Sequence, residues 1–489
     1  MGRSTTPSFC LTLKLNTSKR DEQILEYRFL CGQRIYNVLV RHCRKQFVKL
    51  FRDPEYRELL KERSNRDLSR EEKNALNQRL AGIRMDYGLS KYQLYGYVKL
   101  QQHRYKKHID SRTAQGIASA VWKACEKYLF DNGREIHLKK RDDLYSLESN
   151  SNDTGIMYRN GYLVWNKLTI AAPVRSKDTY AKEAIKHRIK YCRIIRKPVG
   201  ARNQYYVQLI LEGLPPVKHP INHGRIGIDI GTSSVAAVGE DFCHLTVLAK
   251  EAAPVEQRIR RLQRKMDRSR RAANPDNYNP DGTVVRKPHK FKESNTYRKD
   301  RQRLRTLQRK RSDVVRQSHE RLANQVLQNG NEIYVEKMTF SGLARRSAKT
   351  ETDKNGRYKK KSRYGKSIGN RAPAKFLEIL NRKLSYEENK IHQVNTQTFR
   401  ASQYSHVTDD YIKKKLSQRG QQINGTWIQR DLYSAFLLMN AAKDLSHADR
   451  ERCFATYENF VRNHNKCIEN LKYGNEKLPS SLASRQLKQ

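Results

Sequence analysis

The stretch "GRIGIDIGTSSVAAVGEDFCHLTVL" at 224–248 decides the fold. Its apolar runs and glycines predict three short β-strands joined by tight turns. Asp229 lies inside the first strand, between Ile228 and Ile230, and Gly231 follows in a close turn. A carboxylate inside a buried strand is unfavourable unless it is paired or metal-bound. Asp229 is therefore a candidate site residue, although a turn-capping aspartate would give the same local pattern.

Two further acids follow in comparable positions. Glu336 ends the apolar strand "NEIYVEKM" at 331–338, and Asp431 opens a predicted helix in "DLYSAFLLMNAA". Taken singly, Glu336 favours a salt bridge and Asp431 a helix cap. Together, the order of strand-Asp, strand-Glu and helix-start Asp is the layout of a ribonuclease-H-like core. Acids that converge there can hold two Mg²⁺ ions, one to activate a water and one to stabilise the leaving oxygen in phosphodiester hydrolysis.

The charge of the chain points to nucleic acid. The 489 residues include 99 Lys and Arg against 50 Asp and Glu, a formal net charge of +49. Phosphate backbones neutralise such a charge, and each contacted phosphate releases counterions. From charge alone, a basic scaffold protein without chemistry fits equally well. The length predicts two to four domains.

Composition also argues against a membrane or secreted protein. The longest apolar stretches fall short of a bilayer span, and the N-terminus lacks the hydrophobic core of a signal peptide. The eight cysteines are scattered and contain no C-x-x-C pair, which predicts neither a zinc ribbon nor a disulfide framework. We therefore expect an intracellular, cytoplasmic protein in a reducing compartment.

The rest of the chain alternates between helical and strand-rich blocks. One strand is predicted at 8–15, a basic helical block from Ser18, and a second strand-rich region that closes with a linker at 213–220. Asp110 is positioned to cap a helix that continues to about Phe130. Two very basic helices are predicted at 254–271 and 297–328. The Pro-, Asn- and Gly-rich segment 272–296 is predicted to be a flexible loop, 341–370 a mobile one, and the end of the chain a disordered tail.

The sequence resembles the TnpB family, transposon-encoded RNA-guided nucleases related to compact type V CRISPR effectors. The similarity lies in "GIDIGTSSVAAV", "IYVEKM" and "IQRDLYSAFLLMNA", which look like the three RuvC motifs of that family. It extends to "GQRIYNVLV" at 32–40, to "RIIRKPVGARNQYYVQLILEGLPP" at 193–216, and to the Arg-rich helix before Glu336. It covers about 8–445, and the order of the motifs is more specific than any one of them.

This resemblance implies a multidomain α/β protein with an RNase H-like (RuvC) nuclease core, a helical recognition lobe and a small β-barrel wedge domain. The implied parts are the first wedge strand (1–17), the recognition lobe (18–133), the wedge β-domain (134–222), the core with motifs I and II (223–399), a degenerate zinc-finger-like insert (400–428), the core with motif III (429–470), and a disordered tail (471–489).

The resemblance also implies site residues and partners. Asp229, Glu336 and Asp431 would be the catalytic metal ligands, for Mg²⁺. The expected partners are a guide RNA and target DNA, with the guide supplying most of the sequence specificity. The expected nucleic-acid contacts are Tyr36, Asn37, Arg258, Arg261, Arg264, Lys265, Arg268 and Arg419. For the Arg-rich helix at 254–271, the alternative is a solvated charged face.

One segment departs from the family pattern. The family carries a four-cysteine zinc finger before the third motif, whereas 400–429 contains no cysteine. His406 alone cannot make a structural zinc site, so no zinc is predicted and a metal-free remnant is expected beside the active site. Tyr404 and Arg419 are candidates for substrate contact there, and so is Trp427, for which packing is favoured.

The sequence therefore predicts an Mg²⁺-dependent, RNA-guided DNA endonuclease with a two-metal RuvC mechanism. Two alternatives stay open. One is an RNA-guided DNA-binding repressor that does not cut, which the presence of all three acids disfavours. The other is a guide-independent transposase or resolvase with the same core chemistry.

Overall fold

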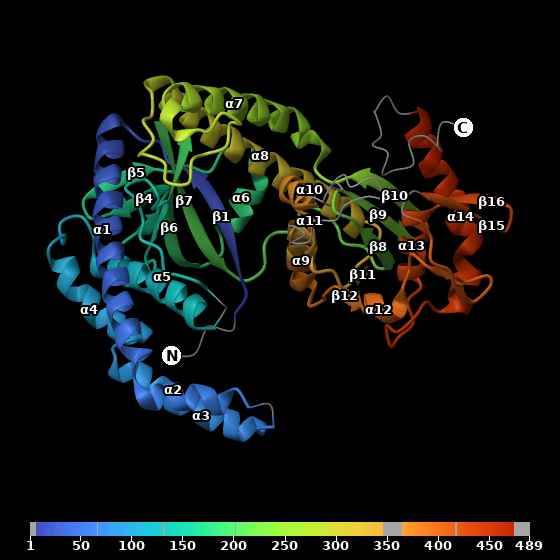
Figure 1. Ribbon diagram of the computed structural model, residues 1–489, viewed down its shortest axis with the longest axis horizontal. Helices are drawn as coiled ribbons and strands as arrows, with labels where there is room; N and C mark the ends of the chain where they lie inside the picture. Colours follow the sequence, from blue (N-terminus) through green and yellow to red (C-terminus); the bar gives the residue numbers. More distant parts are fainter. Residues whose placement is uncertain are drawn as a thin grey trace. The chain divides into compact units, whose positions relative to one another are not determined.

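The computed structural model of the protein describes residues 6–65, 67–130, 133–200, 202–345, 364–415 and 418–473. The chain divides into two compact units, Met1–Pro216 and Val217–Gln489. The boundary lies inside the segment 213–220, where the sequence indicates a linker. Each unit combines helices with β-sheets, so the chain is a multidomain α/β protein (Figure 1).

The helices of the first unit begin where the sequence provides caps. Before α1, the Ser18 backbone N–H donates to the Asp21 carboxylate at 2.9 Å, and the Ser18 hydroxyl accepts from the Asp21 N–H at 3.2 Å. Before α5, the predicted cap Asp110 accepts from the Thr113 N–H at 2.9 Å. The helices are α1 (Lys19–Leu50), α2 (Pro54–Arg63), α3 (Arg70–Asp86), α4 (Lys91–His103), α5 (Ser111–Phe130) and α6 (Thr179–Ala184).

The strands of the first unit form two sheets. One has the order β1-β7-β6-β2 and the other β3-β4-β5, with antiparallel pairing throughout. Both are open in the described part of the chain, so the predicted small barrel is not closed there. The strands are β1 (Ser8–Lys14), β2 (Ser146–Glu148), β3 (Met157–Arg159), β4 (Tyr162–Trp165), β5 (Leu168–Ala171), β6 (Ile189–Val199) and β7 (Arg202–Glu212).

The second unit is built on a mixed five-stranded sheet of order β10-β9-β8-β11-β12. β9 is antiparallel to both of its neighbours, whereas β11 runs parallel to β8 and β12 parallel to β11. The first three strands are consecutive in the chain, as the stretch at 224–248 predicts. The strands are β8 (Arg225–Ile230), β9 (Ser234–Gly239), β10 (Phe242–Val247), β11 (Glu332–Glu336) and β12 (His392–Val394).

Helices pack on both faces of this sheet. Ile226, Ile228 and Ile230 of β8 are buried with apolar residues of α8 and α11. On the other face, α13 packs on β8 and β9, and α14 on β10. The helices are α7 (Ala253–Ala272), α8 (Asn295–Leu327), α9 (Phe340–Ala344), α10 (Tyr364–Arg371), α11 (Pro373–Leu384), α12 (Thr396–Phe399), α13 (Arg430–Met439) and α14 (Arg450–Tyr473).

The segment before α13 consists of two small hairpins, and short 3-10 turns complete the unit. The hairpin strands are β13 (Tyr404–Ser405), β14 (Asp410–Tyr411), β15 (Gly420–Ile423) and β16 (Thr426–Gln429), and the 3-10 turns are η1 (Lys250–Ala252), η2 (Pro275–Asn277) and η3 (Ser385–Glu387).

Two predictions for this unit are corrected. The tail predicted from 471 is wrong at its start, because α14 continues to Tyr473; residues 474–489 lie outside the described part of the chain. The segment 272–296 contains η2 and an ordered turn instead of a structureless loop. Of the segment 341–370, residues 346–363 lie outside the described residues. Among the residues that are described, no helix is long and apolar enough to cross a membrane.

Candidate active site

The three acids singled out by the sequence line one pocket of the second unit. The pocket has a volume of about 280 Å³, and Asp229, Glu336 and Asp431 come to it from β8, β11 and α13. Its other lining residues are Ile230, Gly231, Thr232, Ser233, Ser234, Met338, Ser402, Arg419, Arg430 and Ser434.

Strand pairing places the first two acids side by side. Val335 of β11 pairs with Ile228 of β8 in the parallel ladder, and both side chains are buried in the same apolar cluster. Because successive residues of a strand point to opposite faces, Asp229 and Glu336 share the opposite face. Both acids come at the carboxyl-terminal ends of their strands.

A close approach of helix to strand brings in the third acid. A Cβ atom on Gly227 would lie 1.9 Å from the Ala435 carbonyl oxygen and 2.3 Å from the Met439 nitrogen, so only glycine lets α13 pack this closely on β8. Asp229 is two strand residues beyond Gly227, about 6.6 Å along the strand. Asp431 is four helix residues before Ala435, about 6 Å along the axis. The contact at Gly227 therefore aligns Asp431 with Asp229.

The acids interact electrostatically. Burial raises the pKa of Asp229 well above its ordinary value, and the neighbouring carboxylates of Asp431 and Glu336 raise it further, while Arg430 lowers it. Burial also raises the pKa of Glu336, although the backbone of Ala401 donates to its carboxylate. A cation in the pocket would relieve this repulsion, because it favours the charged form of each acid.

The chemistry of the donor set fits a divalent metal. Three carboxylates are the oxygen ligands that Mg²⁺ prefers. The Ser434 hydroxyl also lines the pocket, is buried and has no hydrogen-bond partner among the described residues, so it can bind a polar ligand. As they stand, no three His, Cys, Asp or Glu side chains in the described ranges are arranged to hold an ion, and the Asp431 carboxylate lies 3.4 Å from the Arg430 guanidinium.

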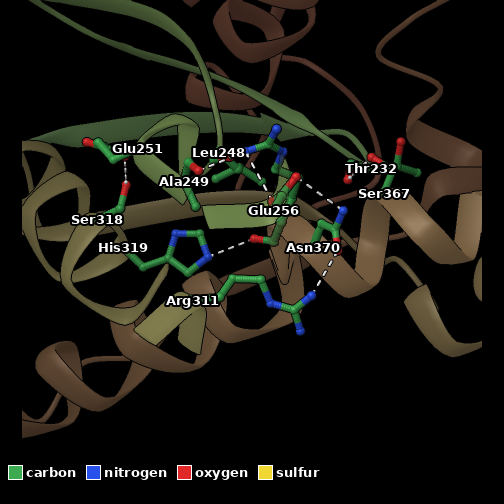
Figure 2. A network of polar contacts seen from close by, with 11 residues as sticks. Thr232, Leu248, Ala249, Glu251, Glu256, Arg311, Ser318, His319, Ser367 and Asn370 are labelled. Carbon is green, nitrogen blue, oxygen red and sulfur yellow. Dashed lines mark hydrogen bonds and ion pairs between the residues drawn. The ribbon is translucent and has the colours of Figure 1, made fainter. Parts of the chain in front are cut away.

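A polar network supports the turn that follows Asp229 (Figure 2). The Gly231 N–H donates to the Ser234 carbonyl at 2.9 Å, which closes the turn, and the Ser367 hydroxyl of α10 donates to the Thr232 carbonyl at 3.1 Å. Figure 2 shows the same network reaching the basic helices, where Asn370 of α10 donates to the Glu256 carboxylate of α7 at 3.3 Å. The turn is thus connected through α10 to α7.

Arg430 and Ser434 are pocket residues that the sequence did not single out. Arg430 directly precedes Asp431, and Ser434 lies one helical turn after it. On a helix, residues three apart share a face, so the spacing from Asp431 could have indicated Ser434. No local signal distinguishes Arg430 from the many other arginines of the chain.

Most of the predicted basic contacts on α7 are exposed. Arg258, Arg261, Arg264 and Arg268 project into solvent, and none of them pairs with a carboxylate in the described part of the chain. Lys265 is also exposed but forms an ion pair with the buried Asp300 at 2.8 Å.

The other three predicted nucleic-acid contacts are buried or half-buried. Tyr36 and Asn37 are buried in the first unit, and the Asn37 amide donates to the Lys139 carbonyl and accepts from its N–H, each at 2.8 Å. These two side chains hold α1 against the segment at Lys139 and present little surface to a ligand. Arg419 is half-buried and lines the acidic pocket.

The segment 400–429 is organised by aromatic packing. His406 is fully buried among Tyr433, Phe436, Phe454 and Tyr457, and its Nδ1 lies 2.7 Å from the Tyr433 hydroxyl. Burial lowers the pKa of His406 to about 4, so the ring is neutral and ties the first hairpin to α13.

Two aromatic residues singled out in this segment take part in packing. Tyr404 is buried and its hydroxyl donates to the Asp409 carboxylate at 2.8 Å. Trp427 packs closely on Gly420, where an added Cβ atom would meet the indole ring at 2.3 Å. The packing role favoured for Trp427 agrees with this contact.

The sequence matches no known family profile and no curated protein. Among solved structures, it is similar to a chain in a cryo-EM structure of a Cas12f1–sgRNA–target DNA complex, with 8% identity over 89% of this chain and 99% of that chain and a TM-score of 0.43. It is also similar to a chain in a cryo-EM structure of a CRISPR–Cas12f ternary complex, with 11% identity, 88% and 99% coverage, and a TM-score of 0.23. These values describe a coarse likeness.

Proposed function

We propose that the protein is an RNA-guided DNA endonuclease whose pocket hydrolyses phosphodiester bonds with divalent metal ions. The observation that carries this proposal is the pocket lined by Asp229, Glu336 and Asp431 in a chain of net charge +49. A protein that only neutralises phosphates has no use for clustered, partly buried carboxylates whose mutual repulsion destabilises the fold.

The layout of the second unit supports an RNase H-like, RuvC-type core. Such a core has consecutive strands around the first acid, a second acid on a neighbouring strand and a third at the start of a helix. β8–β10, β11 and α13 follow this order. We propose that this core comprises 223–399 and 429–470, with the insert 400–428 between them.

The acids, the arginines and the serine of the pocket have different roles in the proposed reaction. Asp229, Glu336 and Asp431 are the only acids that line this pocket in the described residues, and they would hold the metal together. When bound there, Mg²⁺ would act as a Lewis acid, which would activate a water and stabilise charge on the leaving oxygen. Arg430 and Arg419, which line the same pocket, attract the scissile phosphate and balance its charge. The Ser434 hydroxyl is available to hold a bound water.

The guided part of the proposal rests on the resemblance to TnpB and on the exposed cations of α7. Arg258, Arg261, Arg264 and Arg268 recur on one side of that helix, a spacing suited to consecutive phosphates of a bound strand. No contact in the pocket distinguishes a guided nuclease from an unguided one, so the bound RNA must be identified directly.

The test begins with the chain purified together with RNA expressed from its native flanking sequence. The RNA is sequenced, and cleavage of a matched DNA target is measured with Mg²⁺ for the parent and for Asp229→Asn, Glu336→Gln and Asp431→Asn. We expect each variant to lose roughly 1,000-fold or more in cleavage rate while still binding target DNA.

The outcomes separate the alternatives. Cleavage by Asp229→Asn at the parental rate would exclude the proposed site. Binding of matched DNA without cleavage by the parent would favour the repressor. Mg²⁺-dependent cleavage that needs no RNA would favour the guide-independent nuclease.

A further inference from the structure

The segment 273–294, which joins α7 to α8, has no role in the acidic pocket. We call it the α7–α8 tip. The sequence predicts a flexible loop here because the segment is rich in Pro, Asn and Gly. The structure shows an ordered element instead, and its order is combined with an excess of exposed positive charge.

Two buried asparagines hold the two sides of the tip together. The Asn277 amide donates to the His289 carbonyl at 2.9 Å and accepts from the His289 N–H at 2.6 Å. The Asn274 amide makes the same pair of bonds with Lys292, at 3.0 and 2.6 Å. Both asparagines are almost fully buried, at 7% and 2% exposure for Asn274 and Asn277. Each asparagine therefore links the two sides of the tip through a pair of hydrogen bonds.

Two arginines at the end of α7 fix the tip to the helix. The Arg270 guanidinium lies 4.1 Å from the centre of the Phe291 ring, and that of Arg271 lies 4.9 Å from the Tyr278 ring. Arg271 also donates to the carbonyl of Gly282 at 2.8 Å. The hydrogen bonds of the two asparagines and the cation–π contacts of the two arginines together define one conformation for the tip backbone.

This ordered backbone displays cations. Arg286, Lys287 and Lys290 are exposed within five consecutive residues, and Pro288 between them restricts the backbone. None of these three side chains pairs with a carboxylate in the part of the chain that the structure describes.

In the described residues, none of the three acids of the tip forms an ion pair with Arg286, Lys287 or Lys290. Asp281 accepts from the Thr283 hydroxyl at 2.7 Å, and Glu293 pairs with Arg301 of α8. Asp276 is exposed and is the remaining acid of the tip. Holding three like charges close together on a fixed backbone is unfavourable in isolation, so the arrangement points to an anionic partner.

We propose that the α7–α8 tip is a preorganised binding surface for the phosphodiester backbone of a nucleic-acid duplex. Five extended residues span at most about 17 Å, which reaches several phosphates of one strand. Lys side chains act as point charges toward phosphate, and Arg adds a bidentate donor pair. The fixed backbone lowers the ordering entropy lost on binding. The inference holds whether or not the acidic pocket cleaves DNA.

Its test compares two triple variants of the full chain. One carries Arg286→Gln, Lys287→Gln and Lys290→Gln in the tip. The other removes three lysines elsewhere in the same unit, through Lys443→Gln, Lys466→Gln and Lys472→Gln; these lysines are exposed and form no ion pair with a described residue. Both have the same net charge, so the long-range field of the chain changes equally. Affinity for a short DNA duplex and for an RNA duplex of the same sequence is measured over a range of salt concentrations, with EDTA present to prevent cleavage.

We expect the tip variant to weaken binding about tenfold or more and to reduce the slope of log affinity against log salt by about 2.7 for three lost contacts, at about 0.9 each. The control variant should change both much less. If the tip variant loses affinity for only one of the two duplexes, that duplex is the type of nucleic acid that the tip binds. Equal changes in the two triple variants, on both duplexes, would overturn the proposal.

A single substitution tests the preorganisation. Asn277→Ala keeps every cation but removes the two hydrogen bonds to His289. We therefore expect faster amide hydrogen exchange in the tip and weaker binding of the duplex, with an unchanged melting temperature of the core. Faster exchange with parental affinity would show that the order of the tip does not serve binding.

Discussion

Asp229 is surrounded by unfavourable interactions for a negative charge. It is half-buried in β8, and two other carboxylates line its pocket. Because its pKa in the folded chain lies above the ordinary value, the folded state is destabilised at pH values above that ordinary value, where the unfolded chain carries the charge freely. Without a bound cation, the site therefore lowers the stability of the protein at neutral pH.

This residue yields a prediction about metal binding that does not depend on cleavage. In EDTA, Asp229→Asn should raise the melting temperature, because it removes one buried charge from the cluster. Added Mg²⁺ should stabilise the parent by linkage and the variant much less. Thermal unfolding with and without Mg²⁺ measures both effects. Glu458→Gln serves as control, because Glu458 is exposed and forms no ion pair within the described ranges. Equal Mg²⁺ stabilisation of parent and Asp229→Asn would contradict the assignment.

His406 makes a second residue-scale prediction, on the pH dependence of stability. Its pKa is about 4 in the folded chain, below its ordinary value of 6.5, because burial disfavours the charged ring. Stability is therefore fully present above pH 6.5 and is lost as the pH falls toward 4, by up to about 3 kcal/mol.

Chemical denaturation of the parent and of His406→Gln between pH 7 and pH 4 measures this contribution. The parent should lose stability more steeply than the variant as the pH falls, with the difference confined to that window. Other buried histidines titrate in both proteins and cancel in the comparison. Parallel pH profiles would mean that His406 is not buried as a neutral ring.

At the scale of elements, the position of α13 on β8 determines whether the acids meet. Gly227 is the contact point, because the α13 backbone occupies the space of a Cβ atom there. The helix start that carries Asp431 is fixed by this contact and by Gln429, whose side chain accepts from the Leu432 N–H at 2.7 Å.

Gly227→Ala should therefore displace Asp431, although Gly227 itself is not part of the pocket. The new methyl group must push α13 away, which we expect to cost about 1–3 kcal/mol of stability. A displacement of about 1 Å at Asp431 should reduce cleavage about 100-fold, beyond the effect of partial unfolding. Cleavage rates and denaturation curves are compared with Gly369→Ala, a helical glycine with open space around it. Parental cleavage by a folded Gly227→Ala chain would show that the close contact does not position the acids.

The sequence predicted elements better than the contacts between them. Strands β8 to β10 and helices α1 and α8 follow from local periodicity, which a short window of sequence contains. The pairing of β11 with β8 joins residues about a hundred positions apart, which no local pattern encodes. α14 was missed because its buried positions, such as Cys453, Tyr457 and His464, are not the aliphatic residues that mark an amphipathic helix.

The same limit applies to the two candidate sites. The three acids could be selected from their strand and helix-start positions, but their common pocket required the tertiary structure. The α7–α8 tip was misjudged for another reason. Its composition is that of a flexible loop, and its order comes from side-chain bonds of Asn274 and Asn277 to distant backbone groups.

At the scale of the whole molecule, the net charge of +49 opposes folding. Like charges repel over about 10 Å at 0.1 M salt, and lower salt extends this range. The chain contains too few acids to neutralise its cations, so many of the exposed cations lack an ion-pair partner. Bound nucleic acid is the expected neutraliser, and stability should depend on it.

The last prediction concerns this dependence. Without nucleic acid, the melting temperature should rise as NaCl is increased from about 0.02 M to 0.3 M, because salt screens the repulsion. A DNA or RNA duplex should raise the melting temperature most at low salt, and the gain should shrink as salt weakens binding. Thermal unfolding over this salt range, with and without duplex and with uncharged dextran as control, measures both trends. If the melting temperature fell as salt increased and did not change when duplex was added, self-repulsion would not limit the stability of this chain.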